Sequence, residues 1–215
     1  MKQLVIFDLD GTLMDTSPGI ISCHNETAQH LGYAPTPMKS SFQGIIGGPL
    51  KGGFIKLYGM NDSTADLAVT HYRKLYAQTG MFQYEIYPGI AELLASLHEQ
   101  GICTAVATLK LERFAKAMLA DAGLTFTPGA IFGEDGTGLS KAYLLKQAMA
   151  HTQKSPTQSI LVGDSKYDAL GAQQAGCDFI AVTYGWGFSC LEEASAGYHT
   201  AVAANVKELT AILQR

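Results

Sequence analysis

Five short apolar runs constrain the fold of this chain most, because each is apolar on both faces of an extended strand. The runs are LVIF (4–7), TAVAT (104–108), AIF (130–132), SILVG (159–163) and FIAVTY (179–184). Strands of this kind are buried on both sides and belong to parallel sheets. Segments with a helical spacing of apolar residues separate most of them, such as residues 90–97, which end before Gly101. The alternation predicts right-handed βαβ units and a three-layer α/β core around a parallel sheet.

One long interval interrupts this alternation. From Ser17 to Gln83 the sequence shows helical patterns and turn-rich pieces such as YAPTP (33–37) and GGPLKGG (47–53), but no good strand. An interval of this length is far too long for a simple βα connection. We therefore expect a core domain formed by residues 1–16 and 84–215, and an all-helical cap domain formed by residues 17–83.

Composition narrows the class of protein. Hydrophobic residues make up 47% of the 215-residue chain and charged residues 16%, which indicates a folded globular protein. The 15 Lys and Arg residues stand against 19 Asp and Glu, with no long basic run, so we expect neither nucleic acid nor a membrane as a partner. The first apolar run is too short for a signal peptide, and no segment is long enough to span a bilayer. With 4 scattered cysteines, these features predict a cytoplasmic protein, and we expect a monomer or weak homodimer.

Polar side chains directly follow three of the predicted strands. They are, strand by strand, Asp8 and Asp10, Thr108 and Lys110, and Asp164 and Asp168. Ligands bind beyond the carboxyl ends of the strands in open parallel sheets, so these side chains should converge if the strands are neighbours. Four carboxylates at one edge would repel one another and raise some pKa values unless a cation lay among them. A hard divalent ion such as Mg²⁺ suits oxygen ligands of this kind.

The spacing of the first two aspartates suggests divided chemical roles. Asp8 and Asp10 lie two residues apart, on the same side of an extended chain, and Gly11 lets the backbone turn sharply after them. One carboxylate can attack phosphorus to form an aspartyl-phosphate, and the other can protonate the leaving oxygen and later activate water. A single aspartate at a strand end is usually a helix cap or a turn former. The combination of DxDGT with a downstream GDxxxD favours the catalytic interpretation.

With these motifs the sequence resembles the haloacid dehalogenase superfamily of phosphohydrolases, and more narrowly its phosphoglycolate-phosphatase-like branch with a helical C1-type cap. The matching segments are DLDGTLMDT (8–16), the GGPL turn of the cap, YPGI (87–90), VATLK (106–110), a lysine at 141 and GDSKYDALGA (163–172). The resemblance implies a Rossmann-like core with an inserted cap. It also implies a Mg²⁺-dependent phosphatase that acts on a small phosphorylated metabolite similar to phosphoglycolate.

The resemblance also implies a role for each matching residue. Asp8 would be the nucleophile and a Mg²⁺ ligand, while Asp10 would be the general acid/base and lend its backbone carbonyl to the metal. Asp164 would be the second carboxylate ligand, and Asp168 a further ligand or an anchor behind the first ones. Thr108 would donate a hydrogen bond to the phosphoryl oxygens.

Two lysines and a glycine complete the predicted phosphate site. Lys141 would offset the charge of Asp8 and of the phosphoryl group. It follows Ser140, a plausible N-cap, and a lysine in the first helical turn is unfavourable against the helix dipole unless it has another task. We also assign phosphate binding to Gly11 and Lys110. Leu109 stands where the family usually has a small polar residue, which leaves open a second interpretation of Lys110 as a solvated side chain.

The cap should set the substrate, because every role above concerns the phosphoryl group. We assign substrate binding to Gly48, Pro49 and Lys51, which form a turn leading into a helix whose free amide groups could meet an anion. Lys51 could equally be a solvent-exposed lysine.

Other functions remain open at this point. A sugar phosphomutase similar to β-phosphoglucomutase, a nucleotidase and a pyrophosphatase would share the double aspartate and the cap. Two non-enzymatic alternatives are a receiver-like phospho-acceptor domain and an inactive family member that only binds a partner. Receiver domains are much shorter and have no use for Asp10. A true dehalogenase is disfavoured, since that branch lacks the second aspartate.

Overall fold

The computed structural model describes residues 2–36 and 38–214. Its main sheet has six strands in the order β5-β4-β1-β6-β7-β8, and every neighbouring pair is parallel. The strands are β1 (Leu4–Phe7), β4 (Cys103–Leu111), β5 (Ile131–Glu134), β6 (Ser159–Gly163), β7 (Asp178–Val182) and β8 (Ala201–Ala203). The five apolar runs therefore form parallel strands as predicted, and β8 is an edge strand that the apolar pattern did not reveal.

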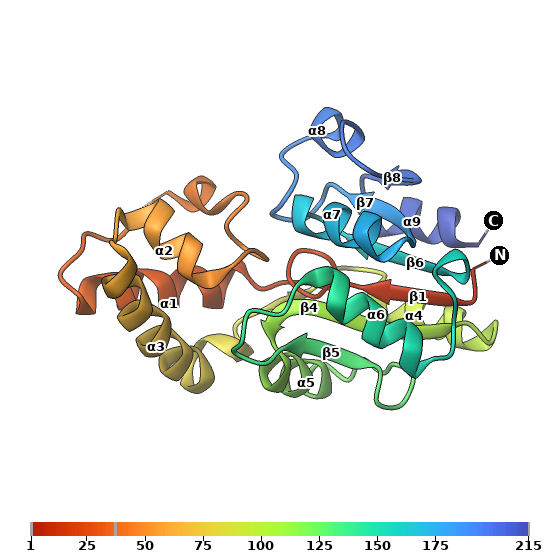
Figure 1. Cartoon of the computed structure of the whole chain (residues 1–215), viewed down its shortest axis with the longest axis horizontal. Helices are drawn as coiled ribbons and strands as arrows, with labels where there is room; N and C mark the ends of the chain where they lie inside the picture. The colour runs from red at the N-terminus through yellow and green to blue at the C-terminus, as the bar shows by residue number, and fades with distance from the viewer. Residues whose placement is uncertain (1, 37, 215) are drawn as a thin grey trace.

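Helices cover both faces of this sheet (Figure 1). They are α4 (Ile90–Glu99), α5 (Glu112–Asp121), α6 (Lys141–His151), α7 (Lys166–Ala175), α8 (Leu191–Ser195) and α9 (Val206–Leu213). Alternate side chains of β1 enter different cores, because successive residues of a strand point to opposite faces. Val5 and Phe7 pack with residues of α4, α5 and α9, whereas Leu4 and Ile6 pack with residues of α6, α7 and α8. The predicted three-layer α/β core is confirmed.

A group of helices lies beside the sheet, between its first and second strands in sequence (Figure 1). It comprises α1 (Ser17–His30), the 3-10 turn η1 (Lys39–Phe42), α2 (Leu50–Tyr58), α3 (Asp62–Gln78) and the 3-10 turn η2 (Gly80–Phe82). Pro37, the last residue of the turn-rich piece YAPTP, lies outside the described residues. The other residues of 17–83 form helices, turns and loops and contribute no strand, so we call this group the cap.

The chain leaves the core and returns to it through two short antiparallel strands. They are β2 (Met14–Asp15) and β3 (Glu85–Ile86), in which Met14 pairs with Ile86 and Asp15 with Glu85. The predicted boundaries after residue 16 and before residue 84 fall just beyond this pair. The division into two domains at these points stays a prediction.

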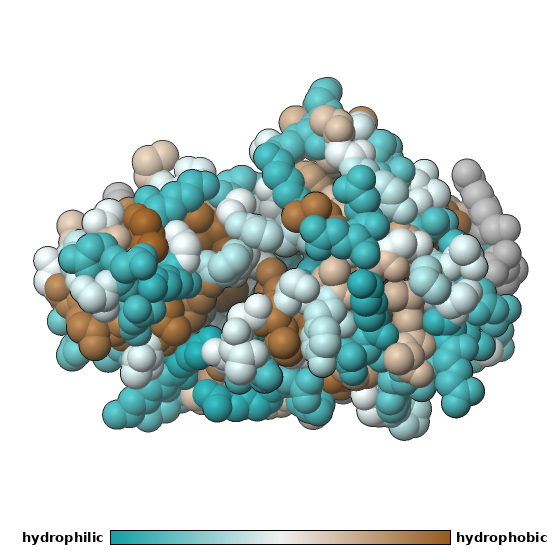
Figure 2. Space-filling model, in the orientation of Figure 1, coloured by the Kyte–Doolittle hydropathy of each residue, from teal (hydrophilic) through white to brown (hydrophobic). Residues whose placement is uncertain are grey.

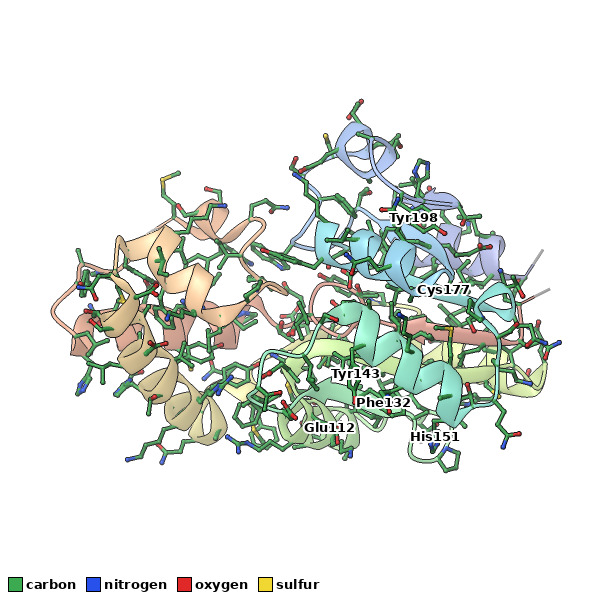
Figure 3. All side chains as sticks on the ribbon, viewed as in Figure 1. Glu112, Phe132, Tyr143, His151, Cys177 and Tyr198 are labelled. Atoms are coloured by element: carbon green, nitrogen blue, oxygen red, sulfur yellow. The ribbon has the colours of Figure 1, made fainter. Side chains whose placement is uncertain are left out.

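Helix α6 is held firmly at both ends, which matters because it carries Lys141. At its start Ser140 accepts a hydrogen bond from the Tyr143 backbone amide. At its end the His151 ring packs edge-on against Phe132 of β5, with ring centres 5.7 Å apart, and Nε2 bonds to the Pro128 carbonyl (Figure 3).

Among the described residues, no helix has both the length and the apolar character that crossing a membrane requires.

Candidate active site

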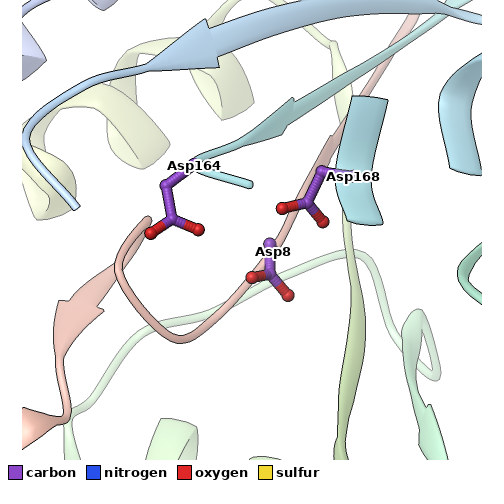
Figure 4. Close-up of side chains that lie close together, drawn as sticks. All are labelled: Asp8, Asp164 and Asp168. Atoms are coloured by element: carbon purple, nitrogen blue, oxygen red, sulfur yellow. The ribbon is translucent and has the colours of Figure 1, made fainter. Parts of the chain in front are cut away.

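Three carboxylates meet at the carboxyl-end edge of the sheet (Figure 4). Asp8 follows β1, and Asp164 and Asp168 follow β6, its hydrogen-bonded neighbour, in which Phe7 pairs with Val162. One oxygen of each carboxylate lies within 4.8 Å of the others, and all three side chains are buried. The parallel register therefore brings together three of the four residues predicted to bind metal.

The charges of this cluster are not balanced by the protein alone. Burial raises the pKa of Asp8 to about 7, against the opposing effect of the Lys141 ammonium. Burial, and then the charges of Asp168 and Asp8, raises the pKa of Asp164 well above its usual value. A site that holds several buried carboxylates close together disfavours their ionised forms unless a cation joins them.

The individual oxygens fit a divalent cation. Asp164 Oδ2 accepts hydrogen bonds from the backbone amides of Trp186 (2.7 Å) and Gly187 (2.9 Å), while its Oδ1 is buried without a hydrogen-bond partner among the described residues. Asp168 Oδ2 accepts from the Ser165 amide and hydroxyl. These bonds orient both side chains, and the unpartnered Asp164 oxygen is available to a hard ion that prefers oxygen ligands.

Lys141 reaches this cluster from the start of α6. Its Nζ lies 2.7 Å from Asp8 Oδ1, 2.7 Å from Asp168 Oδ1 and 2.9 Å from the Ala107 carbonyl. Burial works against its charge, but the two carboxylates hold the pKa of Lys141 above its ordinary value. Gly171 of α7 makes room for it, since a Cβ there would come within 2.5 Å of the lysine Cγ. Lys141 thus points into the carboxylate cluster, and its role toward the phosphoryl group stays a prediction. Gly171 is a contributor that the sequence did not indicate.

Asp10 has partners of its own, separate from the three clustered carboxylates. Its Oδ1 accepts a hydrogen bond from the Thr16 hydroxyl (2.5 Å) and pairs with Lys110 Nζ at 2.9 Å. Lys110 also donates to the Tyr76 hydroxyl (3.1 Å) and lies over that ring, 4.6 Å from its centre. The lysine side chain is only 7% exposed. The solvated interpretation of Lys110 is therefore wrong, because Asp10 and an aromatic ring of the cap replace water around its charge.

Two further predicted residues lie at the same edge. Thr108, which is buried, ends the regular part of β4, and its hydroxyl oxygen accepts a hydrogen bond from the Lys110 amide (3.1 Å). Gly11 has φ +79°, and a Cβ on it would overlap the Asp164 carboxylate. A residue with a side chain would thus push the loop after β1 away from Asp164. The phosphate-binding roles of Thr108, Gly11 and Lys110 stay predictions.

The cap residues chosen from the sequence separate in the structure. A cavity of about 80 Å³ lies between the cap and the core, and Gly48 is one of the residues that line it. Pro49 precedes α2 as its N-cap residue. Lys51 is not among the described residues that line the cavity, because its ammonium pairs with Asp66 at 2.9 Å and with Asp62 at 3.6 Å on α3. Its role in substrate binding remains a prediction that this placement does not support.

The cavity wall combines residues to which the sequence assigned a role with residues to which it assigned none. Asp10 and Lys110 lie in its wall on the core side, and the cap contributes His24, Arg73 and several apolar and aromatic side chains. Figure 2 shows hydrophobic residues gathered around the hollow between the cap and the rest of the molecule. Nothing in the local sequence distinguishes His24 or Arg73 from other helical residues, since only the packing of the cap onto the core brings them here.

The loop YGWGFS (184–189) connects the metal-ligand candidates to the cap. The Trp186 amide binds Asp164, its indole Nε1 donates to Asp15 (2.8 Å), and its carbonyl accepts a hydrogen bond from Gly44 of the cap (2.7 Å). Gly187, the second glycine of the loop, cannot carry a side chain without approaching Ser165 closely. The loop therefore packs beside the site and holds Asp164 directly.

Comparison with known proteins finds relatives that match nearly the whole chain. The tyrosine-protein kinase PtkA of Mycobacterium tuberculosis is 34% identical over 96% of this chain and 71% of its own length. A 5'-nucleotidase of Pseudomonas aeruginosa is 32% identical (98% and 95%), and a phosphoglycolate phosphatase of Vibrio parahaemolyticus is 29% identical (98% and 96%).

A solved structure described as a predicted phosphatase from Clostridium acetobutylicum superposes with a TM-score of 0.91 at 33% identity, and the match covers 100% of both chains. The haloacid dehalogenase-like hydrolase family model matches residues 5–182. The resemblance inferred from the motifs is confirmed: the chain belongs to the haloacid dehalogenase-like hydrolase family.

Proposed function

We propose that the protein is a Mg²⁺-dependent phosphatase that hydrolyses a small phosphorylated metabolite, similar to phosphoglycolate, through an aspartyl-phosphate. The observation that carries this proposal is the pair of aspartates after β1, each of which is buried with its own lysine. Asp8 lies with Lys141 among the clustered carboxylates, and Asp10 lies with Lys110 on the side of the cap cavity. Phosphatases among the relatives and structural neighbours support the same reaction class.

The carboxylates of Asp8, Asp164 and Asp168 fit a divalent cation, because Asp164 keeps a buried oxygen without a partner and the cluster carries excess negative charge. Asp8 and Asp164 would hold Mg²⁺ with the backbone carbonyl of Asp10, and Asp168 would bind it or anchor the site. Bound there, the ion would offset the charge on the phosphoryl oxygens.

The protein's own groups account for the transfer steps. Asp8 attacks phosphorus, so that a bond forms between its carboxylate and phosphorus as the bond to the leaving oxygen breaks. Asp10 acts as the general acid and delivers a proton to that oxygen. Asp10 then takes a proton from water, which attacks phosphorus and releases phosphate and a free Asp8 carboxylate.

The remaining groups hold these two aspartates in place. Lys141 stabilises the negative charge around Asp8, and Lys110 with Thr16 fixes the direction of the Asp10 carboxylate. Cap closure over the site would exclude water during the first step. We also propose that the protein works as a cytoplasmic monomer or weak homodimer, with no nucleic acid or membrane as partner.

Phosphate release from a panel of phosphate compounds tests this function. The panel contains the esters phosphoglycolate, uridine monophosphate and glycerol 3-phosphate and the anhydride pyrophosphate, with Mg²⁺ or with EDTA. We expect Mg²⁺-dependent turnover of at least one ester, and a loss of at least about 10³-fold in kcat for Asp8→Asn, because the nucleophile is removed.

Asp178→Asn is the matched control, since Asp178 begins β7 and pairs with Lys2 away from the site. It should keep full activity. Full activity of Asp8→Asn, or no turnover of any ester, would contradict the proposal. Formation of glucose 6-phosphate from glucose 1-phosphate would identify a mutase instead.

A further inference from the structure

The wall of the cavity between the cap and the core contains one cationic side chain with a hydrogen-bond donor that has no acceptor among the described residues. Among the described residues that line it, the cationic side chains are Lys110 and Arg73. Lys110 is committed to Asp10 at 2.9 Å and to the Tyr76 hydroxyl at 3.1 Å. Arg73 is therefore the cationic side chain of this wall that can bind a ligand.

Arg73 comes from α3 of the cap, and its side chain is about one-third exposed. Its Nε is buried and makes no hydrogen bond within the described residues. Its nearest charged contact is Nη2 to Glu134 Oε2 at 3.5 Å, which is long for a charge-assisted hydrogen bond. A buried guanidinium nitrogen without an acceptor is unfavourable in the free protein, and an acceptor supplied by a ligand would remove that cost.

Glu134 does not depend on Arg73 for its own hydrogen bonds. It ends β5, and its two oxygens already accept from the backbone amides of Gly136 (2.8 Å) and Gly138 (2.6 Å). The carboxylate thus contacts the guanidinium through Nη2 at long range, and the buried Nε has no acceptor among the described residues. This contact orients the Arg73 guanidinium but does not supply an acceptor for its Nε.

The cap also places a neutral imidazole, that of His24, in this wall. His24 stacks on Phe54 with ring centres 4.3 Å apart, and burial lowers its pKa to about 3, so it carries no charge at neutral pH. Its Nδ1 is also buried without a partner in the described part of the chain. The neutral imidazole can donate or accept, whereas the Arg73 guanidinium only donates, so the Arg73 Nε is the group that calls for a ligand with an acceptor atom.

We propose that Arg73 determines substrate specificity by binding a second anionic group of the substrate, a carboxylate or a second phosphoryl group, at the end away from the reacting phosphate. This inference rests on the proposed phosphatase function and narrows its substrate class to phosphomonoesters with two anionic ends. An anion is favoured over a neutral group because the planar guanidinium offers parallel donors that match carboxylate and phosphate oxygens.

Two matched substrate pairs test the inference. Phosphoglycolate is compared with ethyl phosphate, and 3-phosphoglycerate with glycerol 3-phosphate, because in each pair a carboxylate is replaced by a neutral group. We expect the wild-type enzyme to favour the carboxylate of at least one pair by roughly 10- to 100-fold in kcat/KM, the range of a charge-assisted hydrogen bond.

Arg73→Gln should abolish this preference through a higher KM for the carboxylate substrate and leave the neutral substrate unchanged. Arg73→Lys should keep part of the preference, since it retains the charge but not the planar fork. Lys74→Gln is the matched control, because Lys74 is the next residue of α3, is exposed and does not line the cavity.

Several results would overturn the inference. One is a wild-type enzyme that hydrolyses both members of each pair equally well. Another is an Arg73→Gln variant that slows both members equally and unfolds at a lower temperature, because Arg73 would then serve only to fasten the cap to Glu134. An absence of turnover for all four esters would also overturn the inference, and the proposed function would fail with it only if uridine monophosphate and pyrophosphate were not hydrolysed either.

Discussion

Replacement of Lys110 by methionine should show whether the buried pair with Asp10 is as important as its geometry indicates. Methionine keeps most of the aliphatic stem, so the change removes the charge without opening a large cavity. The lysine and aspartate side chains are only 7% and 5% exposed. Removal of one partner of a buried ion pair leaves the other charge uncompensated, which costs about 3–5 kcal/mol. The Tyr76 hydroxyl would lose its charged donor as well.

We therefore expect Lys110→Met to lower the free energy of unfolding by about 3–5 kcal/mol, measured by urea denaturation at pH 7. A folded domain typically has about 5–15 kcal/mol of stability, so the variant should be weakened but measurable. Tyr76→Phe, which keeps the ring under the ammonium and removes only the hydroxyl, should cost about 1 kcal/mol.

A double-mutant cycle with Asp10→Asn isolates the pair itself. Each single variant leaves the other charge without its partner. The double variant should therefore lose less stability than the sum of the losses of the two single variants, with a coupling energy of up to about 3 kcal/mol. Lys116→Met is the matched control, since Lys116 forms an exposed pair with Glu112 and should change stability by less than about 1 kcal/mol. A Lys110→Met cost as small as that control, or simple additivity with Asp10→Asn, would refute the reasoning.

Two other predictions concern His24 and Gly11. Burial depresses the pKa of His24 to about 3 in the folded state, whereas the unfolded chain binds a proton below about pH 6.5, so stability is lost as the pH falls. Between pH 7.5 and pH 5 the wild-type protein should lose about 2 kcal/mol more than His24→Phe in urea unfolding, and equal losses would disprove the buried neutral imidazole. Gly11→Ala should lower the unfolding free energy and weaken Mg²⁺ binding in calorimetry, because its Cβ would overlap Asp164. Gly32→Ala has a similar φ of +83° but open space around it, so it should cost only about 1 kcal/mol and leave Mg²⁺ binding unchanged; the same effect from both variants would contradict the close approach.

Local pattern predicted the parts of this protein in which sequence neighbours decide the outcome. The apolar runs became parallel strands because a segment that is hydrophobic on both faces is stable only when helices cover both sides. Asp8, Asp164 and Asp168 were expected to converge because parallel neighbours end at one edge, and the pairing of β1 with β6 brings them within 4.8 Å. The sequence did not predict edge strand β8, because its three residues, two of them partly exposed, are too few to show a strand pattern.

Long-range packing decided the environment of each charged side chain. Lys110 and Lys51 look alike in the sequence, yet one is buried between Asp10 and Tyr76 and the other pairs with Asp66 on the cap surface. No sequence pattern could separate them, because the partner of each lysine lies on a different segment of the folded chain.

The sequence by itself determined the sheet, the helical segment between its first two strands, the family and the convergence of three carboxylates at one edge, since these follow from periodicity and from the spacing of a few polar residues. Only the tertiary structure decided which cationic side chains pair closely with carboxylates and which keep a donor without an acceptor. Arg73 and His24 came to line the cavity only because α1 and α3 pack over the end of β4, where burial, and not residue type, determines whether a nitrogen finds an acceptor.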